Sequence, residues 1–408
     1  MVALVLFALP RRAEPDPYLG LGSAVAHRGA QLVNKALNTQ VTTQHSTGLK
    51  GPIVFTNAPI DLPTVDFLEP LGNLNPPGHT FPTDHIYFYY VNLGFPAVIN
   101  PITTVNPTNC KSGCPVYAPA DGYLSNIRLS SDNGGTPNQY NVTFTHTDTF
   151  SSYLDHLTTL DPSILAQAGR INPSGNNGEW IPVKAGEVVG TVGGVSGENA
   201  LDFGVTNLQI TQPFINPSHY GFEANSDSPI KYYADPLKSM LYGMVGRQTP
   251  DHWGRDEKDG IFCYDLPNTV LGNWAIQGSD PNWTNPDSWS QQLSFSYDSN
   301  YSSQMRITFG GESGVHPFGV IGAWMVQPGA LAFESVTAIT GAYGYQIYGW
   351  DPNTGNIDLN SGINGSTGPK GLFMIQLIDN NTLKAEYFAF TAAVTTLPFD
   401  SNAVYYNR

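Results

Sequence analysis

The sequence predicts an all-β protein with few helices, in which one β-sheet domain is followed by a second antiparallel β-barrel or sandwich domain. Three observations lead to this prediction. Charged residues make up only 12% of the chain, whereas aromatic residues also reach 12%. Glycine and proline are abundant, with 42 and 32 residues, and they supply turns. Between these turns lie short runs rich in Val, Ile, Tyr, Phe and Thr, which is the pattern of β-strands.

The chain of 408 residues is long enough for two or three domains. Its composition suggests a polar segment over 1–50, a proline-rich leader over 51–84, a β domain over 85–230, a helix and linker over 231–260 and a C-terminal β domain over 261–408. In the linker, Asp235-Pro236 opens a helix with apolar residues at helical spacing, and Gly246 ends it.

Strands are expected wherever a β-favouring run lies between turn signals. In the first β domain these runs are 85–91, 116–117, 122–129, 140–146, 152–157, 188–192 and 201–205. In the second they are 261–264, 291–297, 305–309, 321–327, 345–350, 372–377 and 382–388. Gly272-Asn273-Trp274 resembles the Gly-x-Trp that opens lipocalin-like barrels, although the motif is short.

Composition also bears on where the protein works. A net charge of −15 argues against nucleic acid or an anionic membrane as a partner. No run of about 18 apolar residues predicts a membrane span. Low charge and several Asn-x-Ser/Thr sequons favour a secreted, extracellular or periplasmic protein. The sequons are at Asn141, Asn282, Asn300, Asn364 and Asn380.

Three cysteines are too few for a disulfide scaffold. Cys110 and Cys114 either close a small loop or are two reduced thiols, and the extracellular composition favours the bond. Cys263 is then left over, and we expect it to be buried and inert.

Four blocks, in order along the chain, resemble the lysostaphin/LytM-type zinc metallopeptidases. PVYAPADG at 115–122 is similar to the family's PVYAxADG, and YLDHL at 153–157 to its YxHL. VKAGEVVGTVG at 183–193 resembles its VkxGqxIGxvG, and LDFGV at 201–205 stands in the place of its HLHFEv. The resemblance runs from about Thr83 to Asn216. It implies a β domain with the duplicated hybrid motif of these peptidoglycan endopeptidases.

The same resemblance implies that the metal site is degenerate. In the family, the His and Asp of an H-x3-D motif and the second His of an H-x-H motif hold zinc, while two further His act on its water. Here His85 matches the first His, but Tyr89 stands at the Asp position. Ala200 replaces a catalytic His, Asp202 replaces a zinc-ligand His, and His156 keeps the remaining catalytic position.

Two interpretations of these residues stay open. A protonated phenol such as Tyr89 is a poor zinc ligand. In the first interpretation, neutral imidazoles at His85 and His156 hydrogen-bond Asp202 and Tyr89 as a polar cluster that fills the site, and no cofactor is expected. Alternatively, His85, His156 and Asp202 hold zinc in a rewired site, because two His and one carboxylate form a known hydrolytic ligand set. His146 is a further donor near His156 in this second interpretation.

The turn before the first strand also carries polar groups. His79 and Asp84 lie in a proline-bracketed stretch that runs into His85. These two residues either reach the groove or, as is usual for proline-bracketed turns, only define the shape of the turn, which is the interpretation that we favour.

The function that we expect is that of a secreted, non-catalytic pseudoenzyme. Its peptidase-like groove would bind cell-wall peptide, glycan or another protein, or act structurally. Abundant tryptophans suit stacking on sugars, and the candidates are Trp180, Trp274, Trp283, Trp289, Trp324 and Trp350. The alternatives are a zinc-dependent hydrolase that uses His85, His156 and Asp202, and a self-assembling extracellular protein that forms homo-oligomers. The C-terminal domain carries no catalytic constellation.

Overall fold

The computed structural model describes most of the chain from residue 45 onward. The described residues are 45–76, 78–90, 110, 113–130, 139–168, 171, 180–194, 199–246, 258–283, 285–310, 322–351, 356–358, 368–389 and 396–408. Residue contacts divide the chain into Met1–Ser46 and Thr47–Arg408, and both large sheets belong to the second unit. Almost all of the polar segment predicted over 1–50 lies outside the described residues, and the other predicted domain boundaries stay predictions.

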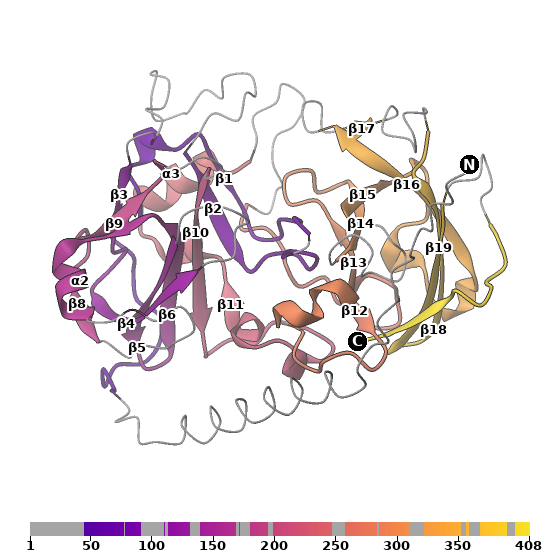
Figure 1. The fold of residues 1–408 in the computed structure, drawn as a ribbon, viewed down its shortest axis with the longest axis horizontal. Coiled ribbons are helices and arrows are strands. Elements are labelled where there is room, and N and C mark those ends of the chain that lie inside the picture. Colours follow the sequence, from indigo (N-terminus) through magenta and orange to yellow (C-terminus); the bar gives the residue numbers. More distant parts are fainter. Residues whose placement is uncertain are drawn as a thin grey trace, which may run out of the picture. The chain divides into compact units, whose positions relative to one another are not determined.

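The first large sheet is antiparallel and runs in the order β1-β2-β10-β6-β5-β4-β8, with β11 paired to β10 (Figure 1). Its strands are β1 (Phe67–Glu69), β2 (His85–Tyr89), β4 (Gly122–Ser130), β5 (Gln139–Thr147), β6 (Phe150–Leu157), β8 (Ile181–Val183), β10 (Ala200–Asn207) and β11 (Ser226–Asp227). Strands far apart in sequence are therefore neighbours, because β10 lies between β2 and β6. This arrangement places two of the sequence blocks, on β6 and β10, beside the strand that carries His85.

One face of this sheet is apolar. Side chains alternate along a strand, so Ile86 and Phe88 of β2 enter the same core as Leu154 of β6 and Leu201 and Phe203 of β10. The opposite face, which we call the polar face, receives the residues between them. The site described below lies on the polar face.

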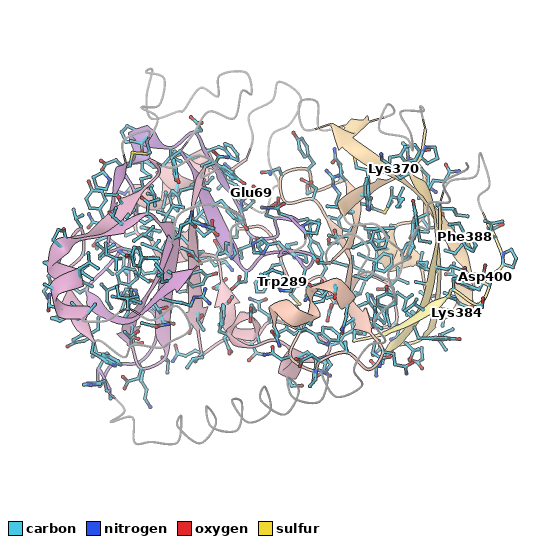
Figure 2. The ribbon with its side chains drawn as sticks, in the orientation of Figure 1. Glu69, Trp289, Lys370, Lys384, Phe388 and Asp400 are labelled. Carbon is cyan, nitrogen blue, oxygen red and sulfur yellow. A yellow bond between two sulfur atoms is a disulfide. The ribbon has the colours of Figure 1, made fainter. Side chains whose placement is uncertain are left out.

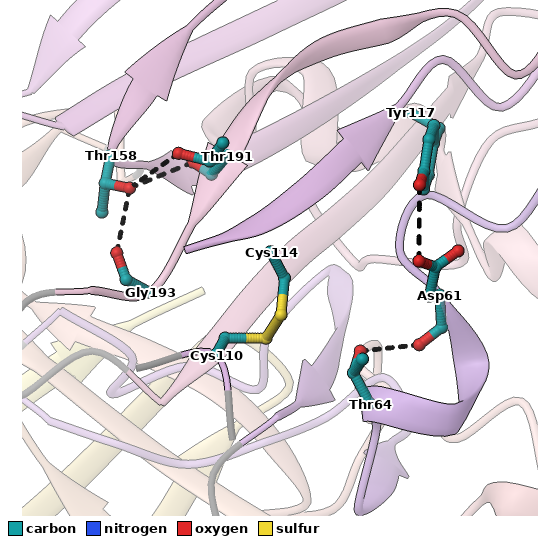
Figure 3. Close-up of a disulfide and its surroundings, with 8 residues drawn as sticks. All are labelled: Asp61, Thr64, Cys110, Cys114, Tyr117, Thr158, Thr191 and Gly193. Carbon is teal, nitrogen blue, oxygen red and sulfur yellow. Dashed lines mark hydrogen bonds between the residues drawn. A yellow bond between two sulfur atoms is a disulfide. The ribbon is translucent and has the colours of Figure 1, made fainter. Parts of the chain in front are cut away.

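A smaller sheet of β3 (Cys114–Tyr117), β9 (Val188–Val192) and β7 (Thr159–Leu160) carries the predicted disulfide. Cys110 and Cys114 are bonded, which confirms the first of the two alternatives (Figure 3). The Thr158 hydroxyl donates to the carbonyls of Thr191 and Gly193 beside it, at 3.2 and 3.0 Å. These contacts tie β9 to Thr158, while the pairing of Val192 with Cys114 and the Gly194 N–H, which donates to the Cys110 carbonyl at 2.9 Å, hold β9 next to the bonded loop.

Helices are short. The described α-helices are α2 (Pro162–Ala168) and α3 (Leu237–Met244), and α3 confirms the helix predicted after Asp235-Pro236. Asp235 accepts hydrogen bonds from the backbone and hydroxyl of Ser239, one turn into the helix. The described 3-10 helices are η1 (Leu62–Thr64), η2 (Pro217–His219), η3 (Phe222–Asn225), η4 (Pro229–Tyr232), η5 (Pro286–Gln291), η6 (Phe333–Ser335) and η7 (Ala338–Thr340).

The second large sheet is a closed antiparallel barrel, which decides between the barrel and the sandwich. Its order is β15-β14-β13-β12-β20-β19-β18-β16-β17, and pairing of β15 with β16 closes the ring (Figure 1). The strands are β12 (Gly272–Ile276), β13 (Gln292–Tyr297), β14 (Met305–Phe309), β15 (Gly322–Val326), β16 (Tyr343–Asp351), β17 (Asn356–Asp358), β18 (Gly371–Asp379), β19 (Thr382–Ala389) and β20 (Val404–Asn407).

Aromatic rings fill the barrel, and the guanidinium of Arg408 stacks on one of them, Trp274. Trp274 and Phe295 are fully buried, and the indole nitrogen of Trp274 donates to the Val270 carbonyl at 2.9 Å. The Arg408 guanidinium lies 4.3 Å from the Trp274 ring centre and donates to the carbonyls of Leu271 and Thr269. Such stacking combines a buried apolar ring with a satisfied cation.

One predicted strand is wrong. Residues 261–264 are extended but enter neither sheet. Phe262 packs into the core of the first sheet and Tyr264 into that of the barrel, so this segment links the two cores. Gly260 before it has φ of 76°, and a side chain there would collide with the backbone of Leu71.

Two further findings bear on location. No helix in the described part of the chain is long and apolar enough to cross a membrane. The disulfide is consistent with an oxidising, extracellular environment. Among the sequons, Asn141 is buried in β5 and donates to Asp155, so it is not open to modification in the folded chain.

Candidate functional site

Strand register places residues of the blocks 153–157 and 201–205 beside the His85 strand on the polar face. Asp202 of β10 lies opposite Tyr87 of β2 on one side and Asp155 of β6 on the other. Gly204 lies opposite both His85 and Tyr153 in the next row. A side chain at Gly204 would collide with the Tyr153 ring, so glycine lets that tyrosine cross β10 toward His85.

His85 is the centre of the site. Its Nδ1 lies 3.0 Å from Asp84 Oδ1 and 3.0 Å from the Tyr153 hydroxyl, and its Nε2 lies 3.2 Å from Asp202 Oδ2. Burial alone would lower the pKa of His85, but the carboxylates of Asp202 and Asp84 outweigh it and raise the pKa to about 10. His85 is therefore an imidazolium between two carboxylates at neutral pH, which corrects the neutral ring expected from the sequence, because sequence alone does not show that two carboxylates meet it.

The two carboxylates are correspondingly ionised. His156 and His85 outweigh the effect of burial and hold the pKa of Asp202 well below its usual range. Hydrogen bonds from His85 and Ser226 likewise lower the pKa of Asp84, against its burial. The Ser226 hydroxyl donates to Asp84 Oδ2 at 2.8 Å.

His156 is the second imidazole on Asp202. Its Nε2 lies 3.3 Å from Asp202 Oδ2, and its Nδ1 lies 2.6 Å from Gln139 Oε1. Its backbone has φ of 71°, in the left-handed region, and its N–H donates to Asp155 Oδ1 at 2.8 Å. Such strain in a non-glycine residue is often found at functional sites. The structure therefore brings together His85, Asp202 and His156, as the sequence predicted.

For His79 and Asp84 the structure favours the first alternative, that they reach the site, over the interpretation that we preferred. Both belong to the site: Asp84 bonds His85 directly, and the His79 ring centre lies 5.2 Å from that of His85. Burial and the charge of His85 lower the pKa of His79 to about 4, so His79 is neutral. The turn fixes the backbone and also places the side chains of His79 and Asp84 beside His85.

Tyr89, which stands at the position of the family's Asp ligand, contacts Glu69 and Phe67. Its hydroxyl donates to Glu69 Oε2 at 2.9 Å, and its ring stacks on Phe67 with centres 4.5 Å apart. Glu69, labelled in Figure 2, is buried, and its Oε1 accepts hydrogen bonds from Ser299 and Asn300, each at 2.8 Å. Through Glu69, Tyr89 thus links strand β2 to the loop between β13 and β14 of the barrel.

Sequence reasoning missed Glu223 and misplaced His146. Burial and the nearby Asp84 raise the pKa of Glu223 to about 8, so this carboxyl is mostly protonated at neutral pH. His146 points into the apolar core, where its nitrogens meet the Asp121 carbonyl at 2.9 Å and Ser152 Oγ at 2.8 Å. It is therefore not a donor to the site, because alternation on β5 turns it to the other face.

The donor set does not fit the zinc site that the family resemblance implies. Metal ligation requires a neutral imidazole, whereas the carboxylates of Asp84 and Asp202 favour the protonated form of His85. Tyr89 donates its proton to Glu69, and Ala200 has no functional group. Within the described ranges, no three His, Cys, Asp or Glu side chains are grouped so as to hold a metal.

Comparisons with known proteins give structural neighbours only. No protein-family model matches the sequence, and no curated protein sequence is similar to it. Csd3 of Helicobacter pylori is similar over 45% of this chain and 35% of its own, at 14% identity and a TM-score of 0.25. A zinc-containing peptidase from Vibrio cholerae is similar over 38% of each chain, at 14% identity and a TM-score of 0.22.

Lysostaphin, solved in solution, is similar over 73% of this chain and 93% of its own, at 15% identity and a TM-score of 0.20. The present chain thus spans little more than a third of the length of the Csd3 and Vibrio cholerae proteins.

Proposed function

We propose that this chain is a non-catalytic, exported binding protein built on a peptidase-like sheet, in which protons occupy the place of the metal. The observation that carries the proposal is the position of His85 between Asp84 and Asp202, at 3.0 and 3.2 Å. An imidazolium there balances the carboxylates without a metal ion. The order of the four sequence blocks supports the peptidase-like origin, as does the position of two of them, on β6 and β10, next to the His85 strand β2.

The remaining catalytic positions support the same proposal. A zinc peptidase needs groups that orient and deprotonate a metal-bound water. Ala200 supplies none, and both nitrogens of His156 already face Asp202 and Gln139. The side chains of His85 and Asp202 are each only 7% exposed, so a substrate bond has little access to them.

Export is supported by the Cys110–Cys114 disulfide and the low charge of the chain. A binding role is supported by the part of the polar face on β4 and β5, where the side chains of Ser125, Thr143 and Thr145 are half-buried. The expected partner is a cell-wall peptide, a glycan or another protein.

One observation favours the alternative, a zinc-dependent hydrolase with His85, Asp202 and His156 as ligands. His85 Nε2 faces Asp202 Oδ2 at 3.2 Å without the geometry of a hydrogen bond, and the buried Asp202 Oδ1 has no hydrogen bond to described groups. Buried polar atoms usually have a partner, and a metal ion would be one. The experiment below separates the two functions.

The test is a calorimetric titration of the full chain with zinc chloride at neutral pH, together with elemental analysis after dialysis. The wild type is expected to retain far less than one zinc per chain. The variant Tyr89→Asp/Ala200→His/Asp202→His restores the family's ligands and is expected to gain zinc, provided that its circular dichroism matches the wild type. One zinc per wild-type chain, lost in both His85→Gln and Asp202→Asn, would overturn the proposal in favour of the hydrolase.

A further inference from the structure

The polar face continues well beyond the histidines. Register rows run across it from His85 through Gly204 and Tyr153 to Thr143, and then to Asn126 of β4. Neighbouring strands lie about 4.8 Å apart, so the four steps from β2 to β4 span roughly 19 Å. His85 and Gly204 are buried, so the accessible part begins at the half-buried Tyr153 and crosses β6, β5 and β4 over about 10 Å, which suits a short chain molecule.

An aromatic pair stands at the far edge of this face. Tyr123 of β4 is 38% exposed, and its ring centre lies 5.4 Å from that of Trp180, just before the edge strand β8. Trp180 has φ of 47°, in the left-handed region that costs free energy for any residue with a side chain. The fold thus holds a large ring at the surface in a strained backbone conformation, as is common at binding sites.

The structure separates Trp180 from the other tryptophans that we considered. Trp274 and Trp283 are buried in the two cores, and Trp324 packs against the barrel core. The Trp289 ring lies against Gly78. The side chain of Trp350 lies outside the described residues. Among the described candidates, Trp180 is the one next to an exposed aromatic ring on the polar face.

Between this pair and the histidines the face presents neutral hydroxyl groups. The Thr145 hydroxyl donates to Ser125 Oγ at 2.8 Å, and Ser125 Oγ donates to the Thr143 carbonyl at 3.4 Å. All three residues are half-buried, and Thr145 lies directly opposite Tyr123. Hydroxyls that both donate and accept beside a ring suit a ligand rich in hydroxyl groups with apolar C–H faces.

The charges around these hydroxyls are paired. Lys184 Nζ lies 2.8 Å from Asp121 Oδ2, and Arg128 lies 3.9 Å from Asp155, which also accepts from Asn141. A charged ligand would have to compete with these partners, whereas a neutral ligand would not.

From these contacts we infer that the Trp180–Tyr123 pair and the hydroxyls of Ser125, Thr143 and Thr145 bind a neutral oligosaccharide across the polar face. This inference rests on the proposed function, because it names the ligand class of the same groove. The rings would stack on a sugar, and the hydroxyls would bond those of the next sugar units toward His85.

The experiment is calorimetry of the full chain with cellotetraose, maltotetraose and N-acetylchitotetraose as neutral probes, and with tetragalacturonic acid and tetraalanine as charged and peptide probes. At least one neutral probe is expected to bind. Trp180→Ala and Tyr123→Ala should each weaken its affinity about tenfold or more. Tyr123→Phe keeps the ring and should retain most of the affinity, and the control Tyr405→Ala removes a tyrosine that is 42% exposed on the barrel without effect.

Binding of no neutral probe, preference for the acid or the peptide, or unchanged affinity in Trp180→Ala would each overturn the inference. Its failure is distinguishable from failure of the proposed function. Absence of both zinc and oligosaccharide binding would remove only the ligand class, whereas stoichiometric zinc in the wild type would remove the proposed function whatever the sugars do.

Discussion

The polar face of the first sheet and the interior of the barrel have the same strand geometry but bury different kinds of side chain. On the polar face, His85, Asp84 and Asp202 are buried charges that are balanced by each other. In the barrel, the inward positions are aromatic and aliphatic, and the cation Arg408 is stacked on Trp274. One region concentrates charge at a cost in desolvation, and the other maximises apolar burial.

This difference shows that the cluster of buried imidazoles and carboxylates lies on the polar face of the first sheet. Buried charged clusters are expensive, so they persist where the fold inherits or uses them. The buried charges of the described barrel are single pairs and not a cluster of imidazoles and carboxylates: Arg306 pairs with Asp298 at 2.8 Å, Arg408 stacks on Trp274, and Glu69 joins the barrel to the first sheet. Substitutions in the barrel should therefore change stability, whereas those on the polar face should also change titration and binding.

The largest effect is expected from Trp274→Ala in the barrel. Trp274 is fully buried, and its removal leaves a cavity and an unstacked Arg408, which should cost about 4 kcal/mol of the free energy of unfolding. Chemical denaturation measures this change. The matched control Trp180→Ala removes a half-buried ring of the same size and should cost much less. Equal losses in the two variants would contradict the assignment of Trp274 to the core.

A smaller but chemically distinct effect is expected from Asp202→Ala. This change leaves His85 and His156 without their shared carboxylate, which should cost about 3 kcal/mol because a buried charge loses its partner. It should also lower the pKa of His85 toward its usual value. A neutral result in denaturation, with the His85 titration unchanged, would show that Asp202 does not hold the imidazolium.

The smallest effect is expected from pH. The pKa of His85 is raised from 6.5 to about 10, so its stabilising contribution is complete below pH 6.5 and is lost as pH rises toward 10. The pKa of Glu223 is raised from 4.5 to about 8, which acts in the same direction over this range. Between pH 6.5 and 8 the wild type should lose about 2 kcal/mol through His85 alone.

The control for this slope is His85→Gln, which keeps a polar side chain but does not titrate. Its unfolding free energy should fall less steeply over the same pH range. A wild-type stability that rises from pH 6.5 to 8 would contradict the charged state assigned to His85.

Much of the fold was predictable because strand patterning is local. Each strand expected in the first β domain is present, and in the second only 261–264 is wrong. Alternation along β2 was enough to place His85 and Tyr89 on one face. The three residues His85, Asp202 and His156 came from the family resemblance, and strand order confirms that they meet.

The partners of the site could not be predicted, because they come from distant parts of the chain. Glu69 meets Asn300 across 231 residues, and Asp84 meets Ser226 across 142. No local pattern marks such contacts. The strands β12 and β20 were not predicted either; they pair with each other although they lie at opposite ends of the barrel sequence.

The most direct test of the central claim is nitrogen-15 NMR of the His85 ring at neutral pH, assigned by comparison with His85→Gln and recorded before and after addition of zinc chloride. The account predicts an imidazolium with both ring nitrogens protonated, whose signals do not move when zinc is added. A neutral ring whose Nε2 signal shifts with one equivalent of zinc would contradict it.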